Sequence, residues 1–165
     1  MALRERSIFR LRPDSSTQCW WEPYDLRATN DLFKHATFVL LDNGSLKAGA
    51  FGAFRVPKTY VQSPTIIIPW SAIVTTGNAK LQIEYRSVAV GESLDQASYQ
   101  ETVAATETVP GTVNLLKDSV LALTGANLAA GDILAFYLSL RGDDAATTLA
   151  SYVILHDLLF GWNDA

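Results

Sequence analysis

Cysteine and histidine are scarce in this sequence of 165 residues, and their scarcity excludes several kinds of site. The single cysteine, Cys19, excludes an intrachain disulfide framework and a zinc site built from cysteines alone. The two histidines, His35 and His156, leave little material for a histidine-rich metal centre. No apolar run approaches the roughly 18 residues of a transmembrane helix, and no apolar segment follows the basic N-terminus as in a secretory signal. We therefore expect no membrane partner.

Charged residues are also sparse, at 18% of the chain against 48% hydrophobic residues. This composition excludes wholesale disorder, and the chain is long enough for a single domain with one core. The formal net charge of −4 argues against a dedicated nucleic-acid-binding protein, because the affinity of such proteins depends on neutralising phosphates. Residues 1–62 hold nine of the 13 Lys and Arg residues, so the positive charge is concentrated in the N-terminal part.

Motifs of known catalytic sites are missing as well: there is no P-loop, no nucleophile-elbow serine and no His-Glu-x-x-His pattern. His156 precedes Asp157, but neighbours along a strand point to opposite faces, so the two side chains would not pair locally. Asp143 and Asp144 would hold calcium only if other loops converged on them, since calcium takes six or more oxygen ligands. We therefore expect a protein that is not an enzyme and has no metal or cofactor.

The C-terminal part of the chain has the pattern of β-strands. Residues 80–88 alternate polar and apolar side chains with a period of two, the clearest strand signal in the sequence. Residues 65–70 form a β-branched run whose internal Pro69 indicates a strand end or an edge strand. Helical spacing at 115–128 and 145–159 offers an alternative, and 93–98 could form one helical turn, but the Thr-rich composition favours strands. Further strands are expected at 99–109, 113–123, 133–140 and 152–162.

Short strands separated by turns, without repeated strand–helix alternation, predict an all-β fold. We expect an antiparallel β-sandwich or jelly roll with an extended N-terminal arm. Residues 1–59 would form this arm and a hairpin region with a turn at 42–45, making docking or oligomer contacts, and residues 60–165 would form the jelly-roll body.

Arginines alternate with apolar residues at the N-terminus, and large aromatic residues follow them. Arginine pairs well with carboxylates, and Trp, Tyr and Arg dominate the energetics of protein interfaces. We interpret the segment as a docking arm; a solvated tail and a nucleic-acid contact are the alternatives. Trp20 and Trp21 fit the core of the chain's own body equally well. The candidate partner-binding residues are Arg4, Arg6, Arg10, Arg12, Trp20, Trp21 and Tyr24.

A series of elements from Tyr60 onward follows a recognisable order. It comprises the strand ending at Trp70, the turn at 75–78, the strand to 88–92, Leu94-Asp95, the strand into Val109-Pro110, and 128–132 leading a strand that ends at Leu140-Arg141. This order resembles the jelly-roll virion proteins of tailed bacteriophages, both capsid decoration (cement) proteins and tail-fibre modules. The resemblance covers about the last hundred residues.

The resemblance implies assembly and not catalysis. It suggests a capsid decoration protein that binds and stabilises the shell of the major capsid protein on the exterior of a virion, assembled in the cytoplasm of a bacterial host. A homotrimer is expected, with a dimer as the alternative. The rival interpretation is a tail-fibre, receptor-binding or carbohydrate-binding module, which exposed aromatic residues around Trp70 or Trp162 would favour. A cupin-type enzyme would need clustered His and Glu ligands that this sequence lacks.

Overall fold

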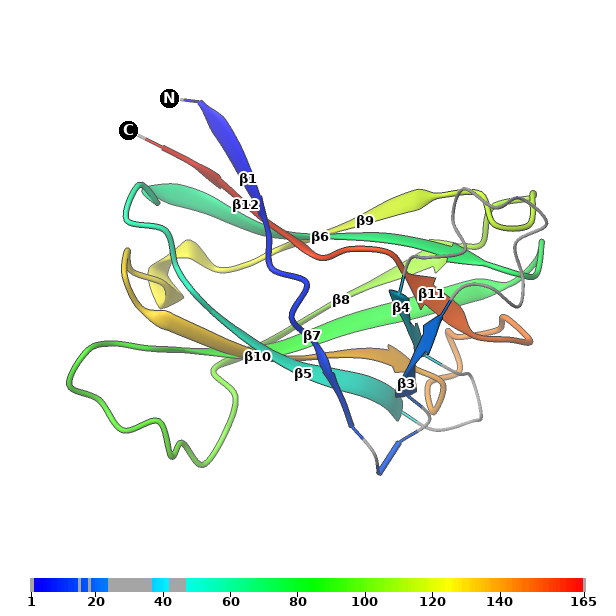
Figure 1. Cartoon of the computed structure of the whole chain (residues 1–165), viewed down its shortest axis with the longest axis horizontal. Helices are drawn as coiled ribbons and strands as arrows, with labels where there is room; N and C mark the ends of the chain where they lie inside the picture. The colour runs from blue at the N-terminus through cyan, green and yellow to red at the C-terminus, as the bar shows by residue number, and fades with distance from the viewer. Residues whose placement is uncertain (1, 15, 18, 24–36, 42–46, 165) are drawn as a thin grey trace.

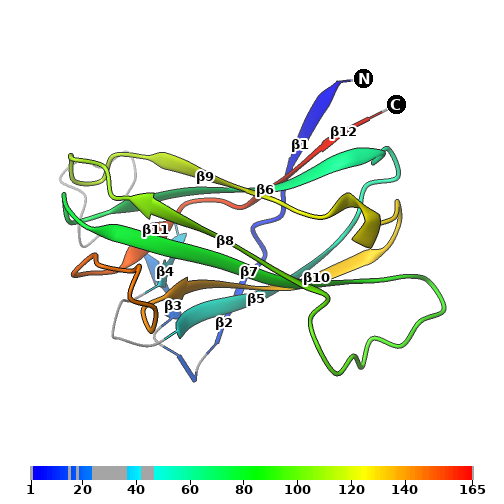
Figure 2. The same cartoon turned by 180° about the vertical axis from the view of Figure 1, so that it is seen from behind.

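Two antiparallel β-sheets face each other in the computed structural model of this protein (Figures 1 and 2). The structure describes residues 2–14, 16–17, 19–23, 37–41 and 47–164; for 20–23 and 37–40 it describes the backbone alone. Among these residues, regular structure consists of strands and one short 3-10 turn, η3 (Gly125–Asn127). In the described part of the chain, no helix has the length and apolar character needed to cross a membrane.

The smaller sheet has five strands. In spatial order these are β2 (Arg12–Pro13), β5 (Lys47–Arg55), β10 (Ile133–Arg141), β7 (Asn78–Val88) and β8 (Glu101–Thr108). β10 lies between β5 and β7 along almost its whole length, with nine residue partners on β5 and eight on β7. This ladder therefore forms the centre of the sheet.

The larger sheet has seven strands arranged around β6 (Gln62–Ala72). One edge of β6 pairs with β9 (Lys117–Ala122), and the other pairs first with β12 (Leu159–Asn163) and then with β11 (Val153–Leu155). On its other side, β12 pairs with β1 (Leu3–Ser7). In the same way β11 pairs with β4 (Thr37–Leu41), and β4 pairs with β3 (Cys19–Pro23).

The core lies between the two sheets and follows the period-two alternation of the strands. The inward residues of β10 are Leu134, Phe136, Leu138 and Leu140, and all are buried. From the larger sheet, Trp70 and Phe160 are fully buried, and the Trp70 indole Nε1 donates a 2.8 Å hydrogen bond to Ser119 Oγ. The predicted all-β antiparallel sandwich is therefore confirmed.

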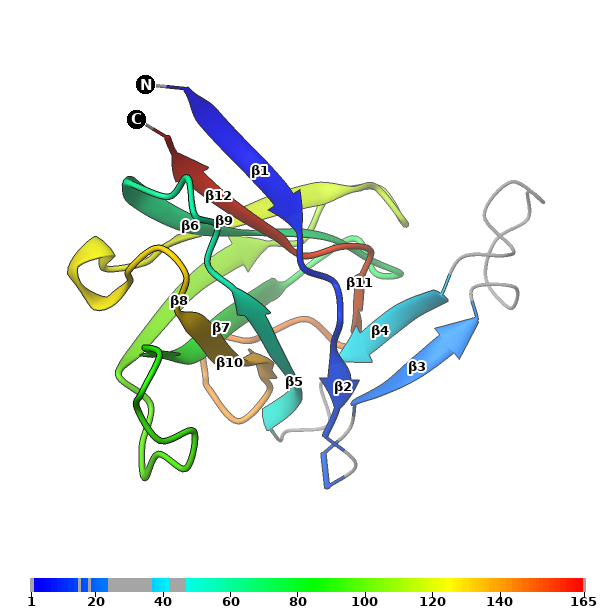
Figure 3. The ribbon, with the colours of Figure 1, turned by 60° about the vertical axis from the view of Figure 1, so that its left-hand side comes forward.

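The N-terminal segment contributes to both sheets. β1 runs beside β12 at the edge of the larger sheet, and β2 lies beside β5 in the smaller one (Figure 3). All five residues of β1 are exposed, but Ile8 and Leu11 are buried in the common core. The sequence analysis divided the chain at residue 59 into an arm and a body. Among the described residues, neither sheet shows a break at this division, because strands from both parts belong to both sheets. The docking role of this segment stays a prediction.

The predicted strand at 152–162 is divided by residues 156–158 into β11 and β12, which pair with successive parts of β6. This division explains how Pro69 can lie inside β6, which has strands on both sides, although a strand end or an edge strand was expected. The backbone N–H of His156 donates to the Pro69 carbonyl at 2.9 Å. Because the N and C=O of a strand residue point to the same side, the missing N–H of Pro69 faces this interruption.

The remaining strand predictions agree with the structure, and the helical alternatives do not. Residues 115–128 contain β9 and η3, residues 145–159 contain β11, and residues 93–98 form no helical turn. The hairpin expected around 42–45 does not form between the flanking strands, because β4 and β5 belong to different sheets. The turn itself lies outside the described residues.

Because Ile8 and Leu11 pack in the common core, Ile8→Ala and Leu11→Ala should each lower the free energy of unfolding by about 2–4 kcal/mol through cavity formation. The control is Leu3→Ala, since Leu3 is 68% exposed and its truncation should change stability by less than about 0.5 kcal/mol. Urea denaturation of the three variants measures the difference. Equal stabilities would mean that the N-terminal segment does not pack as described.

Candidate functional site

The outward face of the five-stranded sheet carries a set of aromatic and polar side chains. Antiparallel pairing places Phe51 of β5 opposite Tyr137 of β10, and Tyr137 opposite Glu84 of β7. On the other side of Phe51, the partner residue is Arg12 of β2. One row across four strands therefore reads Arg12, Phe51, Tyr137 and Glu84.

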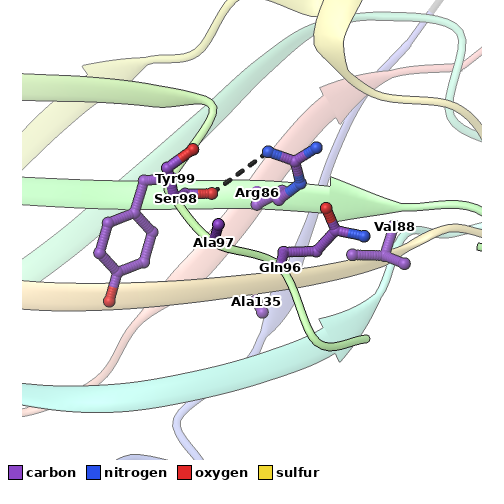
Figure 4. A pocket seen from close by; sticks show the side chains of 7 residues that line it. All are labelled: Arg86, Val88, Gln96, Ala97, Ser98, Tyr99 and Ala135. Atoms are coloured by element: carbon purple, nitrogen blue, oxygen red, sulfur yellow. Dashed lines mark hydrogen bonds between the residues drawn. The ribbon is translucent and has the colours of Figure 1, made fainter. Parts of the chain in front are cut away.

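Two aromatic rings on this face are accessible to solvent. Phe51 is 45% exposed, and its ring packs on that of Tyr137 with a centroid separation of 4.7 Å. Tyr99, which precedes β8, is 43% exposed, and Figure 4 shows its ring pointing from the loop toward β10. Burial raises the pKa of the Tyr99 phenol, and the negative charges of Glu84 and Asp14 raise it further. Tyr99 therefore lies on the same face as the Phe51 row.

Tyr137 is buried, and its ring packs against the exposed ring of Phe51. Its ring lies where a side chain at Gly49 would be, since a Cβ built on Gly49 would come within 2.4 Å of the ring. Its hydroxyl donates to Asp14 Oδ2 at 3.2 Å. Burial and the Asp14 charge raise the pKa of Tyr137, which keeps the phenol protonated at neutral pH. The ring is thus fixed in place beneath Phe51.

Ion pairs surround the aromatic rings. Lys47 pairs with Glu84, and its Nζ lies 4.8 Å from the centroid of the Tyr137 ring. Arg141 donates to Gln82 Oε1 at 2.7 Å and to both carboxylate oxygens of Asp143 at 2.8 and 2.9 Å. These bonds lower the pKa of Asp143. These ion pairs and hydrogen bonds therefore hold the polar side chains in defined positions.

A pocket of about 280 Å³ lies at the end of this face, beneath the loop formed by residues 89–100 (Figure 4). The loop extends beyond one end of the sheet (Figure 1). It is attached by hydrogen bonds from the Gln100 N–H to the Tyr85 carbonyl (2.8 Å) and from Arg86 Nη1 to the Ser98 carbonyl (3.2 Å). The pocket is lined by Arg86, Val88, Gln96, Ala97, Ser98, Tyr99 and Ala135.

The four arginines expected to bind a partner are distributed over both sheets and the segment between them. Arg4 and Arg6 lie on β1 of the larger sheet, where Arg4 pairs with Asp164 at 2.7 Å. Arg12 lies on β2 of the smaller sheet, and exposed Arg10 lies between these two strands. Trp20 and Trp21 belong to β3, but their side chains lie outside the described part, as does all of Tyr24. Whether the tryptophans serve an interface or the core stays open.

Exposed aromatic residues around Trp70 or Trp162 would have favoured a glycan site there, but both tryptophans are buried. Among the described side chains, the exposed rings are those of Phe51 and Tyr99, which the sequence analysis did not single out. A signal for Phe51 existed in the uncharged run 49–54, where each of two phenylalanines follows a pair of small residues, but nothing near Tyr99 distinguished it.

The acidic residues between the strands, among them the two considered as calcium ligands, have other partners. Asp143 pairs with Arg141, Asp144 with Lys80 at 2.5 Å, and Asp132 accepts a hydrogen bond from Ser87 Oγ at 2.8 Å. Asp157 accepts one from Ser7 Oγ at 2.7 Å. In the described ranges, no group of three or more His, Cys, Asp or Glu side chains could hold a metal ion.

No protein-family model matches the chain, and no curated protein matches it in sequence. Among solved structures it is similar to a family 35 carbohydrate-binding module from Clostridium thermocellum, with a TM-score of 0.53 and 10% identity over 97% of this chain and 98% of that one. The fold is a jelly roll. A family 35 module of Cellvibrio japonicus Abf62 gives a TM-score of 0.50 and 13% identity over 99% of this chain and 95% of that one.

A family 6 carbohydrate-binding module is similar to the same extent, with a TM-score of 0.50 and 11% identity over 95% of this chain and 92% of that one. An α-L-arabinofuranosidase, MgGH51, gives a TM-score of 0.52 and 12% identity, but the match spans only 23% of its length. At such identities the likeness shows the fold alone. It agrees with the predicted jelly roll and says nothing of a phage particle.

His156 supplies a pH-dependent contribution to stability. Burial lowers its pKa from 6.5 to about 4, and its Nε2 lies 2.8 Å from Ser71 Oγ. Between pH 6.5 and 4, His156 is therefore protonated in the unfolded chain and neutral in the folded chain. Stability is complete above pH 6.5 and falls as the pH falls through this window, by about 3 kcal/mol. Urea unfolding from pH 7 to 4 should show this loss in the native protein relative to His156→Gln; parallel profiles would contradict it.

Proposed function

We propose that this protein is a non-enzymatic carbohydrate-binding module that takes a saccharide chain on the outer face of its five-stranded sheet. The observation that carries the proposal is the pair of exposed rings, Phe51 and Tyr99, beside fixed polar groups on one face. Aromatic rings present flat apolar surfaces to the C–H faces of sugars, and a few placed polar groups bind the hydroxyls.

The surface is organised before a ligand arrives. Tyr137 supports Phe51 from below, and the pair of Lys47 with Glu84 crosses three strands of the sheet. Groups held in this way lose little conformational entropy on binding, so more of the interaction energy remains as affinity. The likeness to carbohydrate-binding modules over nearly the whole chain supports the proposal at the level of fold. Fold alone does not specify function, so the proposal depends on these side chains.

Truncation of the exposed rings tests the proposal. Phe51→Ala and Tyr99→Ala should each weaken binding about tenfold, since loss of a stacked ring costs roughly 1.4 kcal/mol. Affinity gel electrophoresis against a panel of soluble polysaccharides measures the retardation of each variant. Leu116→Ala is the control, because Leu116 is 59% exposed outside this face and its loss should leave retardation unchanged. Retardation that survives loss of both rings would contradict the proposal.

Capsid decoration is the second candidate, favoured by a different part of the surface. Exposed apolar side chains at Leu115, Leu116 and Val120 precede and continue along β9 of the larger sheet. At the far edge of that sheet, β1 presents Arg6 to solvent. An exposed apolar patch at one edge of the sheet and an arginine at the other would give two contact points for a major capsid protein shell on a virion exterior, bound as a trimer or dimer.

The capsid reading predicts that the purified protein co-sediments with shells from its source that lack it, in stoichiometric amounts. Arg6→Ala combined with Arg10→Ala should reduce the bound fraction several-fold through loss of two arginine contacts, while Phe51→Ala should bind as the native protein does. These side chains are exposed, so the fold should persist. Absence of the native protein from the pelleted shells would exclude this function.

A further inference from the structure

The pocket beneath the 89–100 loop has a cationic side chain in its wall and a floor of small residues. Arg86 on β7 is opposite Ala135 on β10, which in turn is opposite Ala53 on β5. The neighbouring row carries the much larger Phe51 and Tyr137. Of this alanine row, Ala135 lines the pocket together with Arg86 and the residues of the loop.

The positive charge of Arg86 is not paired with a carboxylate of the described residues on this face. Glu84, which lies two residues before Arg86 on the same face of β7, already pairs with Lys47 of β5. Arg86 donates one hydrogen bond from Nη1 to the carbonyl of Ser98. Within the described residues, no carboxylate pairs with its guanidinium. The pocket thus contains a positive charge whose other N–H groups are available to a ligand.

We propose that the saccharide recognised by this face carries anionic substituents, carboxylate or sulfate, and that Arg86 binds one of them in the pocket. The inference rests on the proposed function and deepens it by naming the ligand class. A guanidinium matches the paired oxygens of such groups through two parallel N–H donors. The hydrogen bond to Ser98 holds the guanidinium in place before the ligand binds.

The aromatic rings complete the arrangement. Tyr99 lines the same pocket as Arg86, and Figure 4 shows its ring and the Arg86 guanidinium on opposite sides of Ser98. A saccharide chain stacked on Tyr99 would therefore reach the guanidinium with a substituent of a neighbouring sugar unit. The whole protein carries a formal net charge of −4, which disfavours non-specific attraction to polyanions. A preference for anionic chains would therefore report a local site and not bulk charge.

Matched polymers test the inference. Highly methyl-esterified pectin and de-esterified polygalacturonate differ in free carboxylate, and dextran and dextran sulfate differ in sulfate. Affinity gel electrophoresis of the native protein should show at least about tenfold tighter binding to the anionic member of one pair, and the pair that responds identifies the substituent. Arg86→Gln should abolish the preference, and Arg86→Lys should retain only part of it, because the charge remains but the paired donors do not.

Lys58→Gln is the matched control, since it removes one exposed positive charge outside the pocket and should keep the preference intact. Thermal unfolding verifies that each variant is folded. Equal binding of both members of each pair, with Phe51→Ala weakening both, would overturn the role of Arg86 and leave the proposed function in place. An anionic preference that persists in Arg86→Gln would also overturn it. No retardation of the native protein by any polymer in the panel would overturn both proposals.

Discussion

The antiparallel register of β10 between β5 and β7 determines both the core and the candidate site. Because strand side chains alternate, one register places Leu134, Phe136, Leu138 and Leu140 against the larger sheet and sends Tyr137 and Arg141 outward. A slip of one residue would exchange the two sets and bury Arg141 in an apolar core. Burial of the leucines therefore also aligns Phe51, Tyr137 and Glu84 on the outside.

Small residues on β5 make this arrangement possible. A Cβ on Gly49 would collide with the Tyr137 ring on the outer side, and one on Gly52 would come within 2.2 Å of the Phe136 ring on the inner side. The two glycines thus let aromatic side chains of β10 lie flat against β5 on both faces. Rigidity of the outer surface comes from the same close packing that fills the core.

Much of the fold could be predicted from local sequence, because period-two alternation and turn residues act over short distances. The alternation of 80–88 identified β7, and the apolar run 133–140 identified β10. Pro69 led to a wrong prediction of where its strand ends. A proline is tolerated inside β6 because residues 156–158, far along the chain, interrupt the neighbouring strand opposite it. The N-terminal segment was hard to interpret for the same reason, because its partners on β12 lie more than 150 residues away.

The candidate site was less predictable than the fold. Phe51, Glu84, Tyr99 and Tyr137 come from four separate segments, and only the sheet register brings them together. Arg12 was expected to bind a partner and does lie in the same row, but the expected aromatic residues, Trp70 and Trp162, are buried. Burial of a tryptophan depends on which face of its strand turns inward, and the composition of the strand alone does not decide that.

The central claim, that the outer face of the five-stranded sheet binds the ligand, is tested most directly by NMR. An ¹⁵N-labelled sample would be titrated with an oligosaccharide from the polymer that retards the protein most. The account predicts that the largest amide shifts fall on β5, β7, β10 and residues 96–100. Shifts concentrated on β1, β6, β9 or β12 of the larger sheet would contradict it.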